Sequence, residues 1–418
     1  MRTMKDSGIE WIGKIPADWE TDRLQWHLEE IKEQNSPIQS ERVLSLTVES
    51  GVIPYEDKGN QGNKSKENYE EYKLAYPETL VINSMNVIIG AVGISKYFGC
   101  VSPVYYVFRP TVGTDLRYIY YLFTNIGFQK ELRKHAKGIM EIRLRISASE
   151  TLKRVIPKPS YEEQCRIADF LDRRCAEIDT VIERTKDTIS EYKKLKQSII
   201  TSAVTAGIRG HRPMKDSKIE WIDSIPAEWH ECRIKNAIFP QEKDVFETDE
   251  IITCFRDGEV TLRKNRREDG FTVSFTENGY HGVDVGDLVI HGMDAFAGAI
   301  GCSDSRGKTT PVVHVCHTIG NNRYFMYFLR SMAYGDILMD LSNGVRIRSS
   351  DYRNFAKLGV FGIVVPPREE QDEIVEYLDS KCASIDTLIA RKAALLEEME
   401  SYKKSVIYEY VTGKKEVS

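Results

Sequence analysis

Residues 4–12 read MKDSGIEWI and residues 214–222 read MKDSKIEWI, so eight of the nine positions are identical at an offset of 210 residues. The pentapeptide IPADW at 15–19 likewise returns as IPAEW at 225–229. Further along, EEQ at 162–164 returns at 369–371, and this offset of 207 residues holds without a gap to the end of both copies, at 205 and 412. A repeat of this length indicates a tandem duplication, in which a globular segment followed by a long helix occurs twice.

Two stretches, one from about residue 161 to 205 and its copy, place apolar residues at alternating spacings of four and three. A sustained heptad of this kind predicts a coiled-coil seam. Prolines at 159 and 366–367 precede the helices, and glycines at 207 and 413 follow them as candidate caps. Lys196 and Lys403 interrupt the seam at the same place in both copies, and a polar seam residue often fixes register. The predicted seam residues are Leu171, Ile178, Ile182, Ile189, Tyr192, Ile199, Leu378, Ile385, Ile389, Leu396, Met399 and Val406.

Each predicted helix would be about 65 Å long and must bury its apolar stripe. Each could pack on its own globular segment, or the two could pack on each other. We favour the second arrangement, in antiparallel orientation, which would give the chain a pseudo-two-fold axis and hold two globular domains at opposite ends of a rod. The fold class expected is therefore two mixed α/β (α+β) domains separated by an antiparallel coiled coil.

Within the globular segments, β-branched and aromatic runs predict strands, and longer periodic stretches predict helices. The shared residues of the two copies are mostly glycines, prolines and aromatics, whereas the polar residues around them differ. The two segments should thus share a scaffold and carry different surfaces. The strands expected are 42–48, 80–82, 86–89, 104–108, 287–290 and 311–315, and the helices expected are 116–135 and about 323–341.

Composition excludes some classes of protein. The chain has 418 residues, of which 41% are hydrophobic and 29% charged, values typical of a globular protein with sizeable cores. No apolar run approaches the length of a membrane span, and the N-terminal residues do not resemble a secretory signal. The eight cysteines are spread singly, which favours reduced thiols and a cytoplasmic location. The net charge of −5 does not by itself indicate a nucleic-acid-binding protein, so any such role depends on local clusters of Lys and Arg.

Basic and amide side chains gather in two loops, at 58–66 and 263–267, and in an Arg-x-Arg pair that follows a shared glycine in both copies. Such side chains reach phosphates and base edges. A solvated turn or structural salt bridges would also explain any one of these clusters, but recurrence of the Arg-x-Arg pair favours contact with DNA. The candidate DNA-contacting residues are Lys58, Asn60, Asn63, Lys64, Lys66, Asn83, Asn86, Lys96, Arg143, Arg145, Arg263, Lys264, Arg266, Arg267, Arg306, Lys308, Arg346 and Arg348.

Motifs for catalysis are weak. The sequence Gly307-Lys308-Thr309 resembles the end of a phosphate loop, but the glycine required five residues earlier is Cys302. His314, Cys316 and His317 could suggest zinc, although no C-x-x-C accompanies them and a strand with ordinary histidines is the simpler interpretation. The dinucleotide, hydrolase-elbow and zinc-protease motifs are missing, as is the tetrad of amino-methyltransferases. We therefore expect a binding protein with no catalytic residue, metal or cofactor of its own.

The order of these motifs resembles one known family. W-I-x-x-I-P-x-x-W at 11–19, Gly90-Ala91-Val92-Gly93, Ser102-Pro103, and Pro159 with the EEQ that follows it are all similar to the specificity subunit of Type I restriction–modification enzymes. The resemblance covers essentially the whole chain, because the copies carry the pattern again.

The resemblance implies two target-recognition domains that read different halves of a split, asymmetric double-stranded DNA site, and two helices that space the half-sites. It also implies partners: two methyltransferase subunits that bind S-adenosylmethionine, and two restriction subunits that use ATP and Mg²⁺. The domains would then be target-recognition domains at 1–158 and 214–365, spacer helices at 159–207 and 366–418, and a linker at 208–213. Two alternatives remain open at this point, a coiled-coil scaffold that does not read DNA and an autonomous nuclease or methyltransferase.

Overall fold

The computed structural model describes residues 2–58, 68–138, 144–266, 278–339 and 352–417. The chain divides into two compact units, unit 1 with Met1–Lys186 and Ala394–Ser418, and unit 2 with Asp187–Ala393. Two long helices, α4 (Tyr161–Ala206) and α7 (Arg368–Val411), each contribute one part to each unit. In the described part of the chain, no helix is long and apolar enough to cross a membrane.

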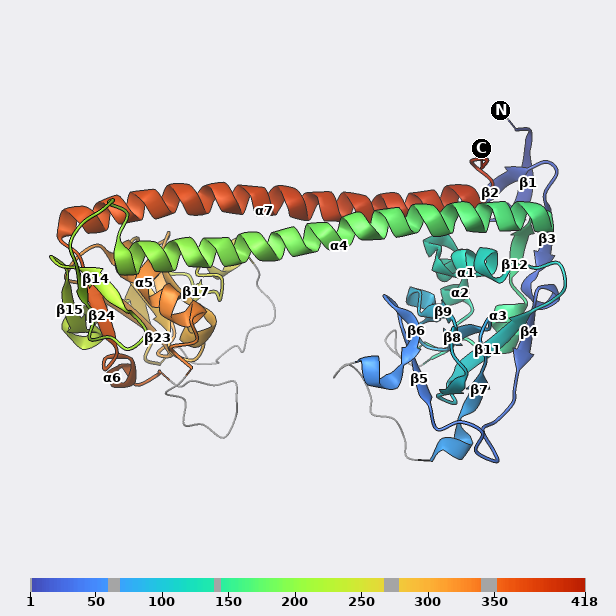
Figure 1. The fold of residues 1–418 in the computed structure, drawn as a ribbon, viewed down its shortest axis with the longest axis horizontal. Helices are drawn as coiled ribbons and strands as arrows, with labels where there is room; N and C mark the ends of the chain where they lie inside the picture. The colour runs from blue at the N-terminus through green and yellow to red at the C-terminus, as the bar shows by residue number, and fades with distance from the viewer. Residues whose placement is uncertain (1, 59–67, 139–143, 267–277, 340–351, 418) are drawn as a thin grey trace. The chain divides into compact units, whose positions relative to one another are not determined.

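Unit 1 is built around two four-stranded sheets, with strand orders β4-β11-β8-β9 and β6-β5-β10-β7, and two two-stranded sheets, β1-β2 and β3-β12. In Figure 1, α1 and α2 lie between the two four-stranded sheets and the long helices of this unit. The strands are β1 Met4–Ile9, β2 Gly13–Pro16, β3 Glu20–Arg23, β4 Leu28–Ile31, β5 Val43–Thr47, β6 Gly51–Pro54, β7 Lys73–Ala75, β8 Leu80–Asn83, β9 Val92–Ile94, β10 Gly99–Val101, β11 Tyr105–Pro110 and β12 Val155–Lys158. The helices are α1 Leu116–Thr124, α2 Ile126–Lys134 and α3 Ala148–Leu152.

Unit 2 repeats this plan. Its sheet β16-β23-β20-β21 has the order of β4-β11-β8-β9, whereas the second sheet of unit 1 is represented by two separate pairs, β17-β18 and β19-β22, with a single parallel bridge between residues 251 and 308. The strands are β13 Met214–Asp216, β14 Ser224–Pro226, β15 His230–Arg233, β16 Ile238–Pro240, β17 Ile252–Cys254, β18 Val260–Leu262, β19 His281–Val283, β20 Leu288–His291, β21 Ile300–Cys302, β22 Gly307–Thr309, β23 Val313–Thr318 and β24 Gly362–Val365. The helices are α5 Asn322–Tyr334 and α6 Phe355–Leu358.

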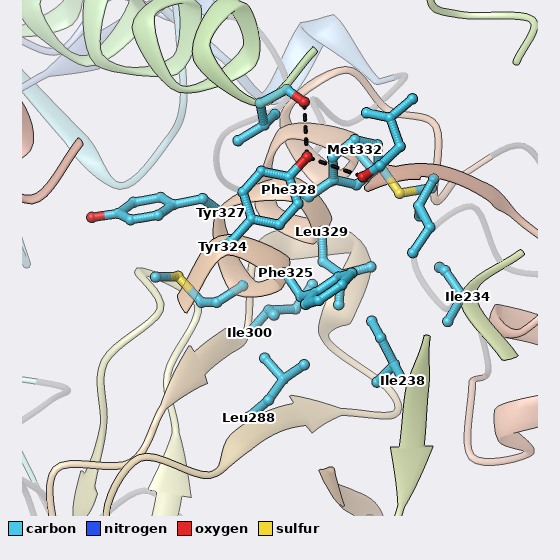
Figure 2. Close-up of a cluster of buried hydrophobic side chains, with 14 of the residues drawn as sticks. Ile234, Ile238, Leu288, Ile300, Tyr324, Phe325, Tyr327, Phe328, Leu329 and Met332 are labelled. Atoms are coloured by element: carbon cyan, nitrogen blue, oxygen red, sulfur yellow. Dashed lines mark hydrogen bonds between the residues drawn. The ribbon is translucent and has the colours of Figure 1, made fainter. Parts of the chain in front are cut away.

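The core of each unit joins one helix of the globular part to the long helices. In unit 2 the apolar face of α5 packs against Leu288 and Ile300 of the sheet, and the buried Tyr324 hydroxyl donates to the carbonyls of Val204 in α4 and Val364 in β24, at 3.2 and 3.0 Å (Figure 2). In unit 1 the equivalent Tyr118 donates to carbonyls of Pro157 and Val411 at 3.2 and 3.0 Å. A buried hydroxyl must find such partners, so this tyrosine ties each globular part to its helix pair.

The two long helices pack antiparallel in each unit. In unit 1, Phe170 of α4 stacks near Tyr410 of α7 with ring centroids 4.2 Å apart, whereas Arg174, further along α4, meets the earlier Tyr402 at 3.2 Å. The predicted seam residues are buried near the globular part, as Leu171 and Leu378 are, and half-buried towards the middle of each helix, as Ile189 and Leu396 are.

Both arrangements considered for the helices are partly realised. The helices pack on each other, and near the globular parts they also join the domain cores. The core of unit 1 includes Leu171 and Val411, and that of unit 2 includes Val204 and Leu378.

The two lysines that interrupt the seam form matching interhelical ion pairs. In unit 2, Lys196 of α4 binds both carboxylate oxygens of Asp386 in α7, at 2.7 and 2.6 Å. In unit 1, Lys403 of α7 binds both oxygens of Asp179 in α4 at 2.6 Å. The two pairs are related by the 207-residue repeat. Each supplies a polar contact that a shift of the helices by one heptad would break, which is how such a residue fixes register.

Three predicted elements were wrong in detail. The stretch 86–89, expected as a strand, forms a 3₁₀ turn at Val87–Ile89 that ends at Gly90 with a φ of +92°. The helix expected over 116–135 is broken at Asn125, whose extended backbone and side-chain bond to the N–H of Gly127 start a second helix. The helix expected near 323–341 ends at Tyr334, followed by Gly335. In each case a local turn residue overrode the apolar periodicity.

Candidate nucleic-acid interface

Several predicted contact residues lie outside the described residues. They are Asn60, Asn63, Lys64, Lys66, Arg143, Arg267, Arg346 and Arg348. The other ten are placed by the structure, five in each unit: Lys58, Asn83, Asn86, Lys96 and Arg145 in unit 1, and Arg263, Lys264, Arg266, Arg306 and Lys308 in unit 2.

In unit 1, Lys96 lies in the turn between β9 and β10, where the Ser95 hydroxyl bonds to the backbone of Tyr97 at both its N–H and its carbonyl. Lys96 is exposed and forms no ion pair with any described residue. Beside it, the exposed guanidinium of Arg42 lies over the Tyr97 ring, 4.5 Å from its centroid. Phe98 follows with 39% of its surface exposed. Exposed cations interleaved with aromatic rings suit nucleic acid, because rings stack on bases while cations meet phosphates.

This group of Arg42, Lys96, Tyr97 and Phe98 is named the β9–β10 cluster. Sequence reasoning found only Lys96. The alternation of Lys96 with Tyr97 and Phe98 was a usable signal, but Arg42 is brought to it by the pairing of β5 with β10.

The two amides of unit 1 shape a turn. Asn83, at the end of β8, is buried, and its side-chain oxygen accepts the N–H of Met85 at 3.0 Å. Asn86 is exposed, and its backbone carbonyl accepts from Ile89 and Ala91. In unit 2 the residue equivalent to Asn83 is His291, which accepts N–H groups in the same way. This placement gives Asn83 a role in the turn and leaves Asn86 as the amide with a face towards solvent.

Lys58 and Arg145 border the undescribed loops of unit 1. Lys58 ends a 3₁₀ turn with its ammonium 5.5 Å from the Tyr55 ring centroid. Arg145 exchanges backbone hydrogen bonds with Lys137 in an isolated antiparallel bridge, and its exposed side chain makes no ion pair with a described residue.

Three of the predicted contact residues of unit 2, Lys264, Arg266 and Arg306, are held by carboxylates of the same unit. Lys264 binds Glu250 at 2.5 Å. Arg266 binds Asp257 at 2.6 Å and Glu259 at 3.0 Å, and its guanidinium lies 4.2 Å from the Phe255 ring centroid. These pairs neutralise Lys264 and Arg266, so a phosphate would have to displace a carboxylate to bind either of them.

Arg306 is the most enclosed of these cations. Its guanidinium binds Asp249 at 2.9 Å and Asp284 at 2.6 Å, and lies 4.5 Å from the Phe246 ring centroid. The bond from Arg306 holds the pKa of the Asp249 carboxyl below its ordinary value, so the pair stays ionised. We conclude that Arg306 organises the loops around β19 and β22.

Two further cations of unit 2 lie close by. Arg263 donates to the Thr253 hydroxyl at 3.3 Å, and Lys308 lies in β22 with its N–H bonded to the Glu250 carbonyl.

His314, Cys316 and His317 are on β23, as the sequence predicted, but they do not converge. The His314 Nε2 lies 2.7 Å from the carbonyl of Tyr352, and the His317 ring stacks on Phe239. Burial raises the pKa of the Cys316 thiol, which favours its protonated form. Among the described residues, no group of three or more His, Cys, Asp or Glu side chains is placed to hold a metal ion.

The repeated tryptophan and the repeated EEQ motif meet in the structure, a link that sequence reasoning missed. In unit 2 the Trp229 indole N–H donates to Glu370 at 2.9 Å, and Arg212 binds the other oxygen of this buried carboxylate at 2.6 Å. In unit 1, Trp19 donates to Glu163 at 2.8 Å, and Arg2 binds it at 2.5 Å.

Each of these arginines also lies over its tryptophan, at 5.2 Å in unit 2 and 5.7 Å in unit 1. This Trp–Glu–Arg cluster anchors the first turn of each long helix. The signal for it was available, since all three residue types recur at the repeat offsets.

Each helix pair carries exposed apolar residues. In unit 1 they include Val181 and Tyr402, both 42% exposed, besides Tyr161 at the start of α4, and in unit 2 they include Leu195 and Leu388, at 48% and 40%. Counting Cys175 and its copy as position a, the four other than Tyr161 occupy position g, which in coiled coils is usually charged. The duplication has repeated these apolar positions, because Val181 matches Leu388 and Leu195 matches Tyr402 at the 207-residue offset. In an antiparallel pair the g positions of both helices flank the same side of the seam.

The opposite side of the seam, at position e, faces the globular part. In unit 1 the Tyr121 hydroxyl donates to Asp172 at 2.7 Å, and in unit 2 Tyr327 donates to Asp379 at 2.7 Å. The apolar g residues, named the g-position pairs, therefore lie on the side of each helix pair that its own globular part leaves uncovered.

No protein-family model matches the sequence, and no curated protein does. Among solved structures, the chain is similar to one from work on complex assembly and conformational transition of the type I R-M (restriction–modification) system. The TM-score is 0.69 at 13% identity, over 96% of this chain and 99% of that one. The chain has the fold of a type I restriction–modification subunit. The fold class expected from the sequence is thus confirmed, and the resemblance inferred from the motifs agrees with it at the level of the fold.

Two more solved structures are similar over most of their length. One is the HsdS subunit from Thermoanaerobacter tengcongensis, with a TM-score of 0.48 and 13% identity over 96% of this chain and 98% of that one. The other is a Type I restriction–modification S subunit from M. genitalium, with a TM-score of 0.40 and 13% identity over 94% and 96% of the two chains.

Proposed function

We propose that this chain is the DNA-specificity subunit of a Type I restriction–modification complex. The observation that carries the proposal is a duplicated scaffold with two different polar surfaces, mounted on antiparallel helix segments in the fold of such a system. Each globular part, taken as residues 1–158 and 214–365, would read one half of an asymmetric, split double-stranded DNA site. The helices, 159–207 and 366–418, would set the distance between the half-sites, and residues 208–213 would link the copies.

In this proposal the chain itself performs no catalysis. Methylation with S-adenosylmethionine, and cleavage driven by ATP with Mg²⁺, would belong to two methyltransferase subunits and two restriction subunits. This chain would supply register and sequence readout. The β9–β10 cluster supports readout by unit 1, since Arg42, Lys96 and Phe98 are exposed where the paired strands β5 and β10 begin.

The g-position pairs support docking of a partner present in two copies. Exposed apolar side chains on a helix pair favour association, because a partner that covers them removes their apolar surface from water. Their repetition at the 207-residue offset suits one partner copy for each unit. We assign these pairs to the methyltransferase subunits, which would each add an apolar helical surface.

Readout of DNA is tested by mapping methylated positions in cells that carry this chain and its methyltransferase subunit. Arg42→Ala with Lys96→Ala should relax recognition of one half-site and leave the other intact, because the β9–β10 cluster belongs to unit 1 alone. A matched control is Lys264→Ala with Arg266→Ala in unit 2. An unaltered split motif in the first variant would remove the β9–β10 cluster from the readout, and methylation without any motif would favour a scaffold that does not read DNA.

The spacer role is tested by deleting one heptad from both helices, at 186–192 and 393–399. Seven residues shorten a helix by about 10.5 Å, which corresponds to roughly three base pairs of DNA. The methylated motif should lose or shorten its spacer while both half-sites keep their sequence. A motif with its original spacer would contradict the idea that the helices measure distance.

Docking is tested by native mass spectrometry of the complex. Leu195→Lys with Leu388→Lys should reduce the number of bound methyltransferase subunits from two to one, since a buried ammonium is costly and the g-position pair of unit 1 is intact. Thr387→Lys, at an adjacent exposed position of the same helix, is the matched control and should leave two bound. Two bound subunits in both variants would place the docking surface elsewhere.

A further inference from the structure

Unit 2 contains a pocket of about 420 Å³ between α5, the turn after β17 and the two long helices. Its wall includes Met326 and Tyr327 of α5, and Asp379, Cys382 and Asp386 of α7. Figure 2 shows the Tyr327 ring at the margin of the aromatic cluster, with its hydroxyl directed away from the aliphatic side chains. The pocket thus lies beside the core of unit 2. It is separate from Lys264 and Arg266, except that Asp257 and Glu259, which bind Arg266, also line the pocket.

The same place in unit 1 contains an aromatic ring. Tyr120, the counterpart of Met326 at the local offset of 206 residues, packs at the edge of the unit 1 core. Its ring meets that of Tyr121 edge to face, with centroids 5.2 Å apart. Burial raises the pKa of the Tyr120 hydroxyl, and the nearby Cys175 and Asp179 raise it further. The Tyr120 ring therefore lies among Tyr121, Cys175 and Asp179.

Each of these neighbours has an identical residue in the wall of the unit 2 pocket. Tyr121 corresponds to Tyr327, Cys175 to Cys382 and Asp179 to Asp386. The two copies share these surroundings and differ in the residue between them, which is Tyr120 in unit 1 and Met326 in unit 2. A thioether chain is narrow and flexible, so it covers less of this wall than a phenol does. The space that Tyr120 fills in unit 1 is consequently open in unit 2.

The chemistry of the wall suits a ring that carries a hydroxyl group. Tyr327 is held by its bond to Asp379 at 2.7 Å, so its ring is fixed for an edge-to-face contact. Carboxylates of Asp257, Glu259 and Asp386 also line the pocket. Each is paired with a cation, Arg266 for the first two and Lys196 for the third, and each keeps lone pairs that can accept a further hydrogen bond. The Arg330 guanidinium lies against Gly258. A Cβ at this position would be 1.8 Å from the guanidinium, so the glycine leaves room for the arginine side chain in the wall of the pocket.

We propose that this pocket binds a para-hydroxyphenyl group, supplied either by a tyrosine of a protein partner or by a free phenol. The bound ring takes the place that Tyr120 has in unit 1, with its edge or face against Tyr327 and its hydroxyl towards the carboxylates of a wall that also holds Lys196, Arg323 and Arg330. The proposal rests on the comparison of the two units and does not depend on DNA binding.

The experiment is ligand-observed saturation-transfer NMR on the full chain with three probes, p-cresol, N-acetyl-tyrosinamide and toluene. The pocket should bind p-cresol, a ligand of one ring, with a Kd on the order of 1 mM. It should bind toluene several-fold more weakly, because toluene lacks the hydroxyl. Binding of both p-cresol and N-acetyl-tyrosinamide would assign the pocket to a tyrosine side chain, and binding of p-cresol alone to a free phenol. Absence of binding by every probe would overturn the proposal.

Two reciprocal variants locate the binding. Met326→Tyr places in unit 2 the ring that unit 1 already has and should abolish the p-cresol signal, whereas Met326→Leu, the matched control, should keep it. Unchanged binding in a folded Met326→Tyr chain would place the probe elsewhere and overturn the assignment. Tyr120→Met should open the equivalent space in unit 1 and raise the stoichiometry from one to two. This increase is measured on the Tyr120→Met chain, so it does not depend on whether the Met326→Tyr chain folds. Absence of the increase would also overturn the proposal.

Discussion

The two units use one scaffold to present different electrostatics. Unit 1 shows Arg42 and Lys96 exposed beside aromatic rings, with Lys96 free of ion pairs to described residues, whereas unit 2 binds Lys264, Arg266 and Arg306 to its own carboxylates. The contacts to the helices, by contrast, are repeated almost atom for atom. The two copies therefore agree at the positions that attach each globular part to the long helices, and they differ at the positions that face solvent.

The largest expected effect on the comparison of the two units is the loss of stability when the glutamate of the Trp–Glu–Arg cluster is removed. Glu370→Ala should destabilise unit 2 by about 3–5 kcal/mol, because it leaves the Arg212 guanidinium and the Trp229 N–H without their buried partner. Glu163→Ala in unit 1 should cost less, since the Glu163 side chain is 13% exposed whereas that of Glu370 is fully buried. The second partner of each arginine, Asp18 for Arg2 and Glu228 for Arg212, is kept in both variants. Hydrogen exchange followed by mass spectrometry reports each unit separately.

In that measurement Glu370→Gln is the matched control, since its amide can still accept one hydrogen bond and should recover part of the loss. Equal destabilisation by Glu163→Ala and Glu370→Ala would mean that burial does not set the difference between the two clusters.

A smaller effect tests the similarity of the units. Tyr118→Phe and Tyr324→Phe each remove a hydroxyl that donates to two buried carbonyls, one on a long helix and one on a strand. Each should cost about 1–2 kcal/mol, and the losses should agree because the distances match. Urea unfolding followed by exchange in each unit gives the values. A clear inequality would show that the two attachments are equivalent in geometry and different in energy.

How far the sequence predicts these features depends on the distance between the residues involved. The long helices and most buried strands follow from local periodicity, as in Leu80–Asn83 and Val313–Thr318. Lys196 and Lys403 were recognised as seam interruptions because the repeat sets them at matching positions. Their aspartate partners, Asp386 and Asp179, could not be named, since the relative register of two helices depends on tertiary packing.

The candidate interface was less predictable for the same reason. A basic residue in a loop looks the same in sequence whether it is free or paired. The partners of Arg306, for instance, are Asp249 and Asp284, which lie 57 and 22 residues away. The β9–β10 cluster required the pairing of β5 with β10, which brings Arg42 to Tyr97. Short turns such as Val87–Ile89 were missed because three apolar residues fit a strand and a 3₁₀ turn equally well.

The electrostatic difference is tested by the salt dependence of DNA binding in the complex with the methyltransferase subunit. For Arg42→Ala with Lys96→Ala, the slope of log K against log salt should become shallower by about 1 for each phosphate that the variant no longer neutralises. For Lys264→Ala with Arg266→Ala, the slope should hardly change, because these cations are neutralised by their own carboxylates. Equal changes would show that DNA displaces the carboxylates of unit 2.

The smallest effect concerns His27, a buried histidine of unit 1 that has no histidine counterpart in unit 2. The His27 Nδ1 lies 3.0 Å from the Thr114 hydroxyl, its Nε2 has no hydrogen-bond partner among the described residues, and the equivalent residue in unit 2 is Ala237. Burial lowers the pKa of His27, and Lys158 lowers it further, although Asp22 acts in the opposite direction. Near neutral pH the ring is therefore neutral in the folded chain.

Because the unfolded chain binds this proton more readily, the contribution of His27 to stability is constant above the ordinary histidine pKa of about 6.5 and decreases as pH falls below it. His27→Ala, which copies unit 2, should reduce the loss of unit 1 stability between pH 7.5 and 5.5 and leave unit 2 unchanged. In unit 2 two half-buried histidines, His291 and His314, also have pKa values that burial lowers, so unit 2 should respond to acid independently of His27. If exchange protection in unit 1 fell equally in wild type and variant, another group would control its response to acid.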